Sequence, residues 1–296
     1  MTSVIAMLFF LPCSGVLSKL AMMTVPNSAE EAQELSMPVL DERLFKSPAV
    51  ALQQAKNAVV KMSRRAARNV GLATPLLLKM DEDVVSAIDV RENLIDRMEV
   101  DISNYLIKLA DQELGDAESH EVTELLNFVT ECERIGDYAV NLTENAEELR
   151  SKGIEFSETA QQELQVLGEA LREIMDYAYR SFTAVDAQPA RRIEPVEEVV
   201  DDMVATRRTN HIRRLRDGQC TVYAGLVFLD ILINAERIAD QCSNLGVYTI
   251  SQFDPSVMNS HHEYIHRLHQ GNDPVFNREY QEKHEKYFGM LSAIID

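Results

Sequence analysis

Two stretches of the chain repeat one order of polar side chains at helical spacing. Residues 131–144, ECERIGDYAVNLTE, and residues 234–246, NAERIADQCSNLG, each hold Glu-Arg-Ile, a small residue, Asp and, four residues later, Asn. Each four-residue step advances a helix by about 400°, so the Glu, Asp and Asn side chains share one face. Their oxygens are hard ligands that suit a divalent cation. The predicted ligands are Glu133, Asp137 and Asn141 in the first copy and Glu236, Asp240 and Asn244 in the second, a constant offset of 103 residues.

A pair of acidic residues precedes each copy. The segments VRENLIDRM and VEEVVDDMV contain Glu92 with Asp96 and Glu198 with Asp202, again four residues apart. In an antiparallel helical hairpin, residues at one level have position numbers with a constant sum. For turns beside Gly115 and Gly218 this rule places each pair level with the Glu and Asp of the motif that follows. We therefore expect four carboxylates to meet in each half of the chain.

Four carboxylates at one level repel one another and have to be protonated or neutralised. Di-iron and di-manganese helical bundles solve this problem with facing carboxylates that share metals, although their Glu-x-x-His pattern is missing from these motifs. We expect a divalent metal ion, with Mg²⁺, Mn²⁺, Ca²⁺, iron and Zn²⁺ as candidates. A solvated acidic row stays open as the alternative, because the constant sum does not fix the rotation of a helix. Arg134 and Arg237 follow the motif Glu and favour structural neutralisation over phosphate contact.

Composition restricts the class of partner. The chain of 296 residues carries 29 Lys and Arg against 48 Asp and Glu, a net charge of −19. It lacks the overall basic footprint of a nucleic-acid binder, and its charge argues against docking on anionic lipids. No C-x-x-C spacing occurs among the four cysteines, which indicates reduced thiols rather than a zinc site.

Long helical periodicity predicts an all-α fold of two tandem antiparallel three-helix bundles, preceded by a short membrane-helix remnant. Ser47 and Pro48 are expected to start the first helix, whose basic face is expected to be solvated, and Gly153 to end the third. The expected helices span about 49–78, 82–111, 119–149, 158–184, 195–216 and 221–250. The expected domains are 1–26, a membrane-helix end; 27–47, a linker; 48–152 and 153–250, the two bundles; and 251–296, a helical tail.

The two ends of the chain differ from the repeats. Residues 1–26 are apolar but interrupted by Pro12, Ser14, Gly15 and Lys19, and no basic n-region precedes them. We therefore prefer the end of a transmembrane helix to a signal peptide or a complete span. The tail holds His261, His262, His266 and His269. A His-rich tract can bind metal, but we expect a surface helix here.

With these residues in hand, the chain resembles the PhoU family of tandem three-helix bundles, through ERIGD at 133–137 and ERIAD at 236–240. The resemblance covers about residues 48–250 and implies metal binding at the acidic motifs. LFFLPCSGVLSKLAMMTVP near the start and HEYIHRL and FNREYQEKHEKYF near the end look like the PhoU-like C-terminal domain of a sodium-dependent phosphate cotransporter. The transmembrane transport core of such a protein is absent from this chain.

The expected function is a cytoplasmic, metal-binding regulatory domain of a sodium–phosphate cotransporter family protein, attached to the membrane through residues 1–26. The alternative is a free-standing PhoU-type regulator of phosphate uptake signalling. An enzyme is not expected, because no catalytic His, nucleophile or glycine-rich phosphate loop accompanies the carboxylates. Assembly into a homo-oligomer is left open.

Overall fold

The computed structural model describes residues 35–184, 186–218, 220–254, 257 and 261–294. Residues 39–296 form a unit distinct from residues 1–38, and the fold below is that of this unit alone. The predicted membrane-helix remnant at 1–26 lies outside the described residues. Among the helices that are described, none is long and apolar enough to cross a membrane.

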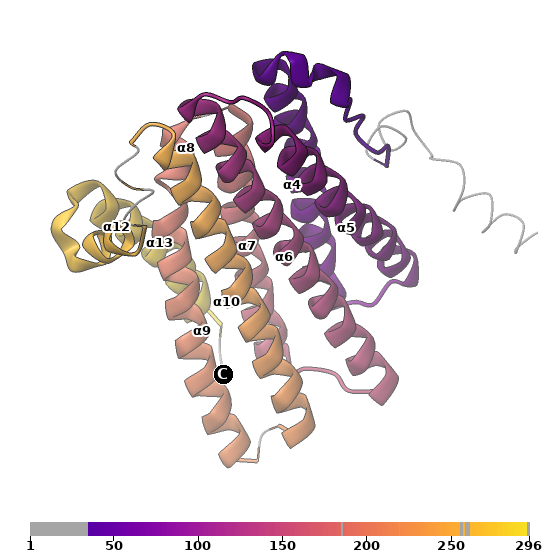
Figure 1. The fold of residues 1–296 in the computed structure, drawn as a ribbon. Helices are drawn as coiled ribbons and strands as arrows, with labels where there is room; N and C mark the ends of the chain where they lie inside the picture. The colour runs from indigo at the N-terminus through magenta and orange to yellow at the C-terminus, as the bar shows by residue number, and fades with distance from the viewer. Residues whose placement is uncertain (1–34, 185, 219, 255–256, 258–260, 295–296) are drawn as a thin grey trace, which may run out of the picture. The chain divides into compact units, whose positions relative to one another are not determined.

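Every regular element in the described part of the chain is a helix (Figure 1), which confirms the all-α prediction. The short elements are η1 (Glu42–Lys46), α8 (Ala187–Ala190), α12 (His261–Arg267) and the π-helical turn η2 (Leu268–Asn272). The long helices are α4 (Pro48–Leu76), α5 (Glu82–Ala110), α6 (Asp116–Lys152), α7 (Glu158–Ala184), α9 (Ile193–Arg216), α10 (Val222–Ser251) and α13 (Pro274–Ser292).

The long helices pack as two related sets. Helices α4, α5 and α6 pack against one another, as do α7, α9 and α10, and each set holds one copy of the acidic motif on its third helix. The sets also contact each other, α4 against α7 and α6 against α10. The helix α13 then packs on α9 and α7. Because the sets share an extensive contact, the domain limits drawn from the sequence stay a prediction.

Local sequence signals fix most helix ends. Gly153 adopts a left-handed conformation, φ 63°, at the end of α6, as predicted for a terminal glycine. The Asp81 carboxylate accepts hydrogen bonds from the first backbone N–H groups of α5, and Asp273 does the same for α13. Ser47 precedes Pro48 at the start of α4, but its side chain makes no capping hydrogen bond. The predicted Ser cap is therefore wrong in its chemistry, although the helix begins where expected.

The predicted solvated basic face of α4 is wrong for Arg65, whereas Arg64 and Arg68 are exposed as predicted. Arg65 is buried, with 1% of its surface exposed, and its guanidinium contacts the sulfur of Met98 on α5. Lys56 and Arg64 lie over the rings of Phe182 and Tyr179 on α7, at 5.8 and 5.9 Å from the ring centres. Cations over aromatic faces are attracted by the ring quadrupole. Part of the basic face therefore joins the two helical sets.

The contact between α6 and α10 follows the sequence repeat. The side-chain amide of Asn141 donates a hydrogen bond to Asn234 Oδ1 (3.2 Å), and that of Asn244 donates to Glu131 Oε1 (3.3 Å). Asn244 lies 103 residues after Asn141, and Asn234 lies 103 residues after Glu131, so the two contacts follow the offset of the repeat. The repeated Asn of the motif thus holds the two halves of the molecule together by symmetrical contacts.

Candidate metal centres

The first acidic centre consists of Glu92 and Asp96 on α5 and Asp137 on α6. Each offers a carboxylate oxygen, and these oxygens lie within 4.8 Å of one another. A separation of this size is at most about twice the bond of roughly 2.0–2.6 Å between oxygen and Mg²⁺ or Ca²⁺, so one ion could bind all three carboxylates. Burial, and then the nearby charges of Asp137 and Asp96, raise the pKa of Glu133. The register expected from the sequence for this half of the chain is therefore observed.

Glu92 is the buried member of the first acidic centre, with 9% of its surface exposed. Asn69 of α4 donates a hydrogen bond to its Oε2 (3.2 Å), but Oε1 is buried without a hydrogen-bond partner. Burial, and then the charges of Asp96 and Asp137, raise the pKa of Glu92 to about 8. A carboxylate in this setting has to hold a proton or meet a cation.

Gly136 makes room for this carboxylate. A Cβ atom at position 136 would lie 2.7 Å from Glu92 Oε2 and 2.8 Å from Oε1. The glycine of ERIGD therefore allows the Glu92 side chain to lie flat against α6. The corresponding residue of the second motif is Ala239, so the two centres cannot have identical shapes.

The second acidic centre consists of Glu197 and Asp201 on α9 and Asp240 on α10, whose carboxylate oxygens also lie within 4.8 Å of one another. Glu197 is 8% exposed. Its Oε2 and the Oδ1 of Asp201 are buried without hydrogen-bond partners. Burial and the nearby charges of Glu194 and Asp201 raise the pKa of Glu197, and burial with Asp240 raises that of Asp201 to about 7.

The structure corrects the predicted partners of Asp240. Glu198 and Asp202 were expected beside it, but their neighbours Glu197 and Asp201 occupy that face. One residue rotates a helix by about 100°. Glu198 and Asp202 consequently face the C-terminal segment, where they contact His269 (3.3 Å) and accept a hydrogen bond from Tyr280 (2.6 Å), respectively.

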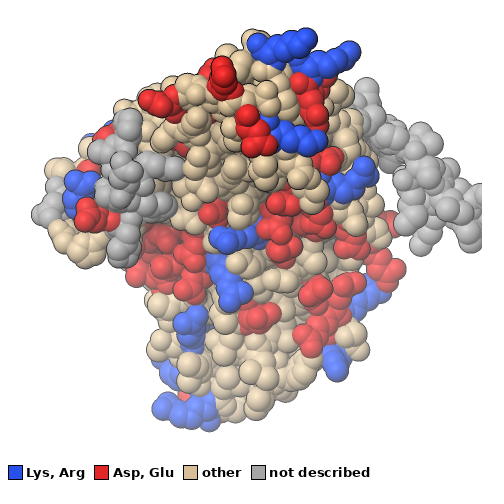
Figure 2. Space-filling view, in the orientation of Figure 1, with Lys and Arg blue, Asp and Glu red and all other residues tan. Residues whose placement is uncertain are grey.

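The remaining predicted ligands surround the two centres. Glu236 is partly exposed, pairs with Arg208 at 3.3 Å and adds its charge to the field at Asp201 and Asp240. The side-chain amides of Asn141 and Asn244 donate hydrogen bonds across the α6–α10 contact. Their participation in metal binding stays a prediction. Figure 2 shows acidic side chains at many places on the viewed face, with basic side chains between the group at the left and those near the centre.

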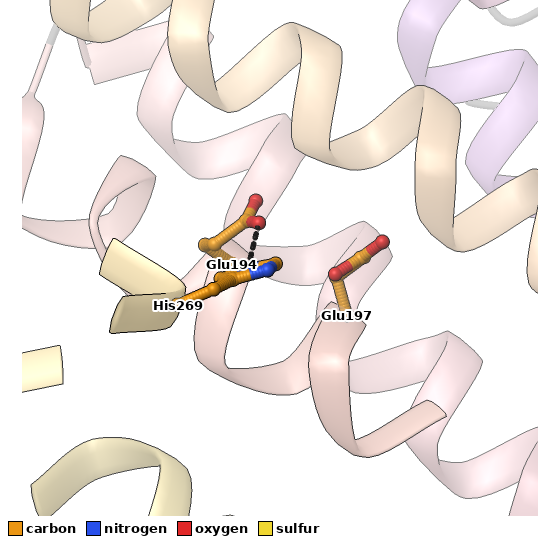
Figure 3. A group of neighbouring side chains, drawn as sticks. All are labelled: Glu194, Glu197 and His269. Carbon is orange, nitrogen blue, oxygen red and sulfur yellow. Dashed lines mark hydrogen bonds and ion pairs between the residues drawn. The ribbon is translucent and has the colours of Figure 1, made fainter. Parts of the chain in front are cut away.

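Sequence reasoning missed Glu194 and placed His269 on a surface helix, and both residues lie beside the second acidic centre. Glu194, Glu197 and His269 offer ligand atoms within 4.8 Å of one another, and Figure 3 shows the imidazole next to the Glu194 carboxylate with Glu197 beside it. Periodicity places Glu194 on α9 but does not reveal that a residue 75 positions later folds back onto it. The available signals were the density of acidic residues in EPVEEVVDD and the His-rich tract that contains His269.

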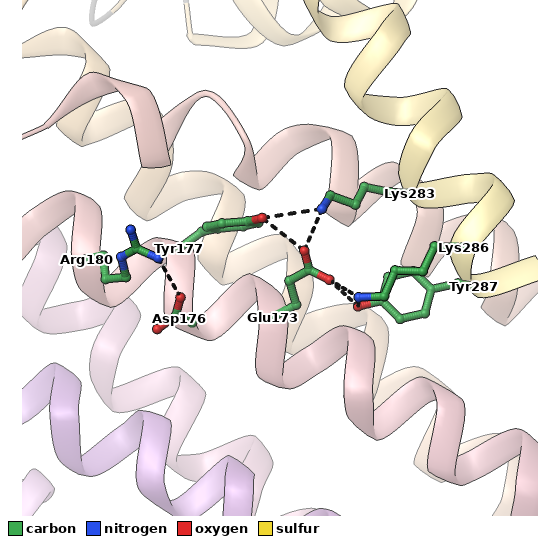
Figure 4. Close-up of polar contacts among 7 residues, drawn as sticks. All are labelled: Glu173, Asp176, Tyr177, Arg180, Lys283, Lys286 and Tyr287. Atoms are coloured by element: carbon green, nitrogen blue, oxygen red, sulfur yellow. Dashed lines mark hydrogen bonds and ion pairs between the residues drawn. The ribbon is translucent and has the colours of Figure 1, made fainter. Parts of the chain in front are cut away.

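A cluster around Glu173 of α7 holds the C-terminal helix α13 in place (Figure 4). The Lys283 and Lys286 ammonium groups lie 2.7 and 2.6 Å from its carboxylate oxygens, and the hydroxyls of Tyr177 and Tyr287 donate to the same oxygens. Burial alone would raise the pKa of Glu173, but these hydrogen bonds outweigh burial and lower it to about 2. The carboxylate therefore stays ionised and binds α13 to α7.

At both acidic centres the repulsion between carboxylates is larger than the stabilisation that hydrogen bonds can offer. Two unit charges about 4.8 Å apart repel by about 3.5 kcal/mol at an effective dielectric constant of 20. Three such pairs exceed the roughly 1.5–3 kcal/mol that one hydrogen bond to a charged group returns. Hydrogen bonds alone cannot stabilise the ionised clusters, and the buried oxygens without partners mark where a proton or cation would be bound. The donor set fits a divalent metal.

Comparison with known proteins agrees with this architecture of two related sets of helices. The PhoU domain family matches residues 59–146 and 164–249, and the chain belongs to that family. A PhoU homolog 1 from Thermotoga maritima, named a phosphate-specific transport system accessory protein, is 30% identical over 121 residues, 41% of this chain and 51% of that relative. The homolog from Clostridium acetobutylicum is 20% identical over 71% of this chain and 94% of its own length.

Two solved structures share the fold. PhoU from Pseudomonas aeruginosa superposes with a TM-score of 0.64 at 20% identity, over 70% of this chain and 97% of its own. The phosphate transport system regulatory protein PhoU from Streptococcus pneumoniae superposes with a TM-score of 0.62 at 18% identity, over 71% of this chain and 98% of its own.

Replacing Gly136 with Ala tests the shape of the first acidic centre. The added Cβ must displace the Glu92 carboxylate, so we expect Mn²⁺ affinity at this centre to fall by about tenfold. Ala also favours helix by up to about 1 kcal/mol, so the metal-free fold should survive. Gly71→Ala is the matched control, because a Cβ there meets nothing within 4 Å. Equal Mn²⁺ titrations for both variants, by isothermal calorimetry, would contradict this role of Gly136.

Two double variants distinguish the observed register from the expected one. Glu197→Gln with Asp201→Asn should remove metal from the second acidic centre and, in EDTA, leave the fold at least as stable, because repulsion is relieved. Glu198→Gln with Asp202→Asn changes the charge equally but should retain metal at that centre. Elemental analysis after gel filtration measures the bound Mn²⁺. Metal loss only in the second variant would support the register expected from sequence.

The Glu173 cluster makes a prediction for acid stability. Its carboxyl has a lower pKa in the fold than its ordinary 4.5. Its stabilisation is therefore fully present above about pH 4.5 and is lost as the pH falls toward 2. Glu173→Gln should cost about 2 kcal/mol at neutral pH and increase hydrogen exchange in α13. Asp176→Asn, which removes an exposed ion pair with Arg180 on the same helix, is the control. Unchanged exchange in α13 would argue against the cluster as its anchor.

Proposed function

We propose that this protein is a metal-binding accessory regulator of phosphate transport. The observation that carries the proposal is the repetition of one feature in both halves of the fold: a buried carboxylate with an oxygen that lacks a partner, Glu92 in one half and Glu197 in the other. Each lies within 4.8 Å of two further carboxylates. A divalent cation would neutralise each cluster and connect two helices.

The names of the relatives support a role in phosphate transport. The homologs from Thermotoga maritima and Clostridium acetobutylicum are named accessory proteins of a phosphate-specific transport system, and the Streptococcus pneumoniae protein is named a regulatory protein. These names favour the alternative kept open from the sequence, a free-standing PhoU-type regulator, over a domain of a sodium–phosphate cotransporter. They also favour regulation over catalysis.

The proposed part played by the metal follows from where the carboxylates lie. Asp96 and Asp137 belong to α5 and α6, and Asp201 and Asp240 belong to α9 and α10. Without a cation, the carboxylates of the two helices repel one another. A bound cation would attract the carboxylates of both helices and hold the helices together. Metal occupancy would therefore set the geometry of the surface that the regulator presents to a phosphate transporter or its sensor.

The test combines a gene deletion with complementation. We expect deletion of the gene in its host to disturb the repression of phosphate uptake by ample phosphate, measured with radiolabelled phosphate. The native chain should restore repression, whereas Asp137→Asn with Asp240→Asn should not, because both centres lose a ligand. Circular dichroism of the purified variant should show unchanged helicity.

Asp89→Asn with Asp101→Asn is the matched control, since both residues are exposed on α5 and the charge change is the same. This control should restore repression fully. Normal regulation of uptake in the deletion strain would contradict the proposed function. Full complementation by the Asp137/Asp240 variant would contradict the need for metal.

A further inference from the structure

His269 reaches the second half of the fold from outside the region that matches the PhoU family. It lies in η2, beyond residue 249 where the family match ends. Its Nε2 lies 2.8 Å from Glu194 Oε1 and 3.3 Å from Glu198 Oε2. In Figure 3 the ring lies next to Glu194, and Glu197 of the same helix stands beside it.

Glu197 connects this histidine with the second acidic centre. A carboxylate oxygen of Glu197 lies within 4.8 Å of ligand atoms of Glu194 and His269, and Glu197 likewise lies within 4.8 Å of the carboxylates of Asp201 and Asp240. Only 8% of the Glu197 surface is exposed, and its Oε2 has no hydrogen-bond partner. A buried carboxylate shared by two groups of ligands is the arrangement found where a carboxylate bridges two metal ions in a helical bundle.

The C-terminal segment is held in place independently of this histidine. Tyr280 donates a hydrogen bond to Asp202 (2.6 Å), and the ring of Phe276 lies 5.7 Å from that of His269. One to two turns further along α13, Lys283 and Lys286 bind Glu173. These contacts position the imidazole at α9 before any ligand binds, which reduces the ordering that a metal would have to impose.

We propose that Glu194, Glu197 and His269 form a further metal position that adjoins the second acidic centre and shares Glu197 with it. The proposal rests on the proposed function and extends it, because it assigns the C-terminal segment to the metal site. Two carboxylates and an imidazole suit a first-row transition ion such as Mn²⁺, Fe²⁺, Co²⁺ or Zn²⁺ better than Mg²⁺ or Ca²⁺, which prefer oxygen ligands alone. The first acidic centre has no equivalent histidine among its described neighbours.

The competing explanation is an ion pair. A protonated His269 would neutralise Glu194 and Glu198 without any metal. The hydrogen bond with Glu194 raises the pKa of His269, which favours the protonated form. The two explanations differ in one observable property. A metal ligand places a nitrogen in the coordination shell of the ion, whereas an ion pair leaves the shell made of oxygen.

Pulsed electron paramagnetic resonance of the full chain loaded with Mn²⁺ measures that property. We expect nitrogen modulation from a coordinated imidazole in the native protein, no such modulation in His269→Gln, and one Mn²⁺ fewer per chain in that variant. His266→Gln is the matched control, because His266 belongs to the same segment, is exposed and lies beside Gln270 rather than the carboxylates. It should keep both the modulation and the stoichiometry.

The other outcomes separate this proposal from the proposed function. Bound Mn²⁺ without nitrogen modulation in the native protein overturns the role of His269 and leaves the acidic centres intact as metal sites. Modulation that persists in His269→Gln overturns it as well. A native chain that binds no Mn²⁺, Fe²⁺, Co²⁺ or Zn²⁺ overturns both.

Discussion

Repulsion within two carboxylate clusters, each built around one buried glutamate, Glu92 or Glu197, is the constraint on which the rest of this structure depends. Helices α5 and α6, and α9 and α10, pack through apolar residues that bring like charges within 4.8 Å. Each such pair opposes folding by a few kcal/mol, in a molecule whose net stability is itself only about 5–15 kcal/mol. The fold can keep the buried Glu92 and Glu197 only by protonating them or by binding cations, and binding cations makes helix packing depend on the metal concentration in solution.

The two halves meet this constraint differently. In the first, Gly136 and Asn69 shape an all-oxygen centre around Glu92. In the second, Ala239 replaces the glycine, and the C-terminal segment brings His269 to the carboxylates of α9. The symmetrical contacts of Asn141 and Asn244 join the halves, so a change at one centre acts on a helix that packs directly against the helix of the other.

The sequence predicts the helices well, because apolar periodicity and residues such as Asp81 and Gly153 act locally. It also predicts the first acidic centre, since Glu92 and Asp96 have no acidic neighbours to confuse the register. The prediction of the second centre fails at this point, because its acidic residues form the adjacent pairs Glu197–Glu198 and Asp201–Asp202. The height of a residue along the hairpin does not decide which member of a pair faces inward. The return of His269 to α9 depends on tertiary contacts that no local pattern encodes.

The most direct test of this account is the free energy of unfolding of the full chain at pH 5 and pH 8, in EDTA and in excess Mn²⁺. Because folding raises the pKa of Glu92 to about 8 and of Asp201 to about 7, metal-free stability should fall as the pH rises from 5 to 8. Mn²⁺ at about 100 times its dissociation constant should restore about 2.7 kcal/mol per site at pH 8. An unfolding free energy at pH 8 that is the same in EDTA and in Mn²⁺ would contradict the account.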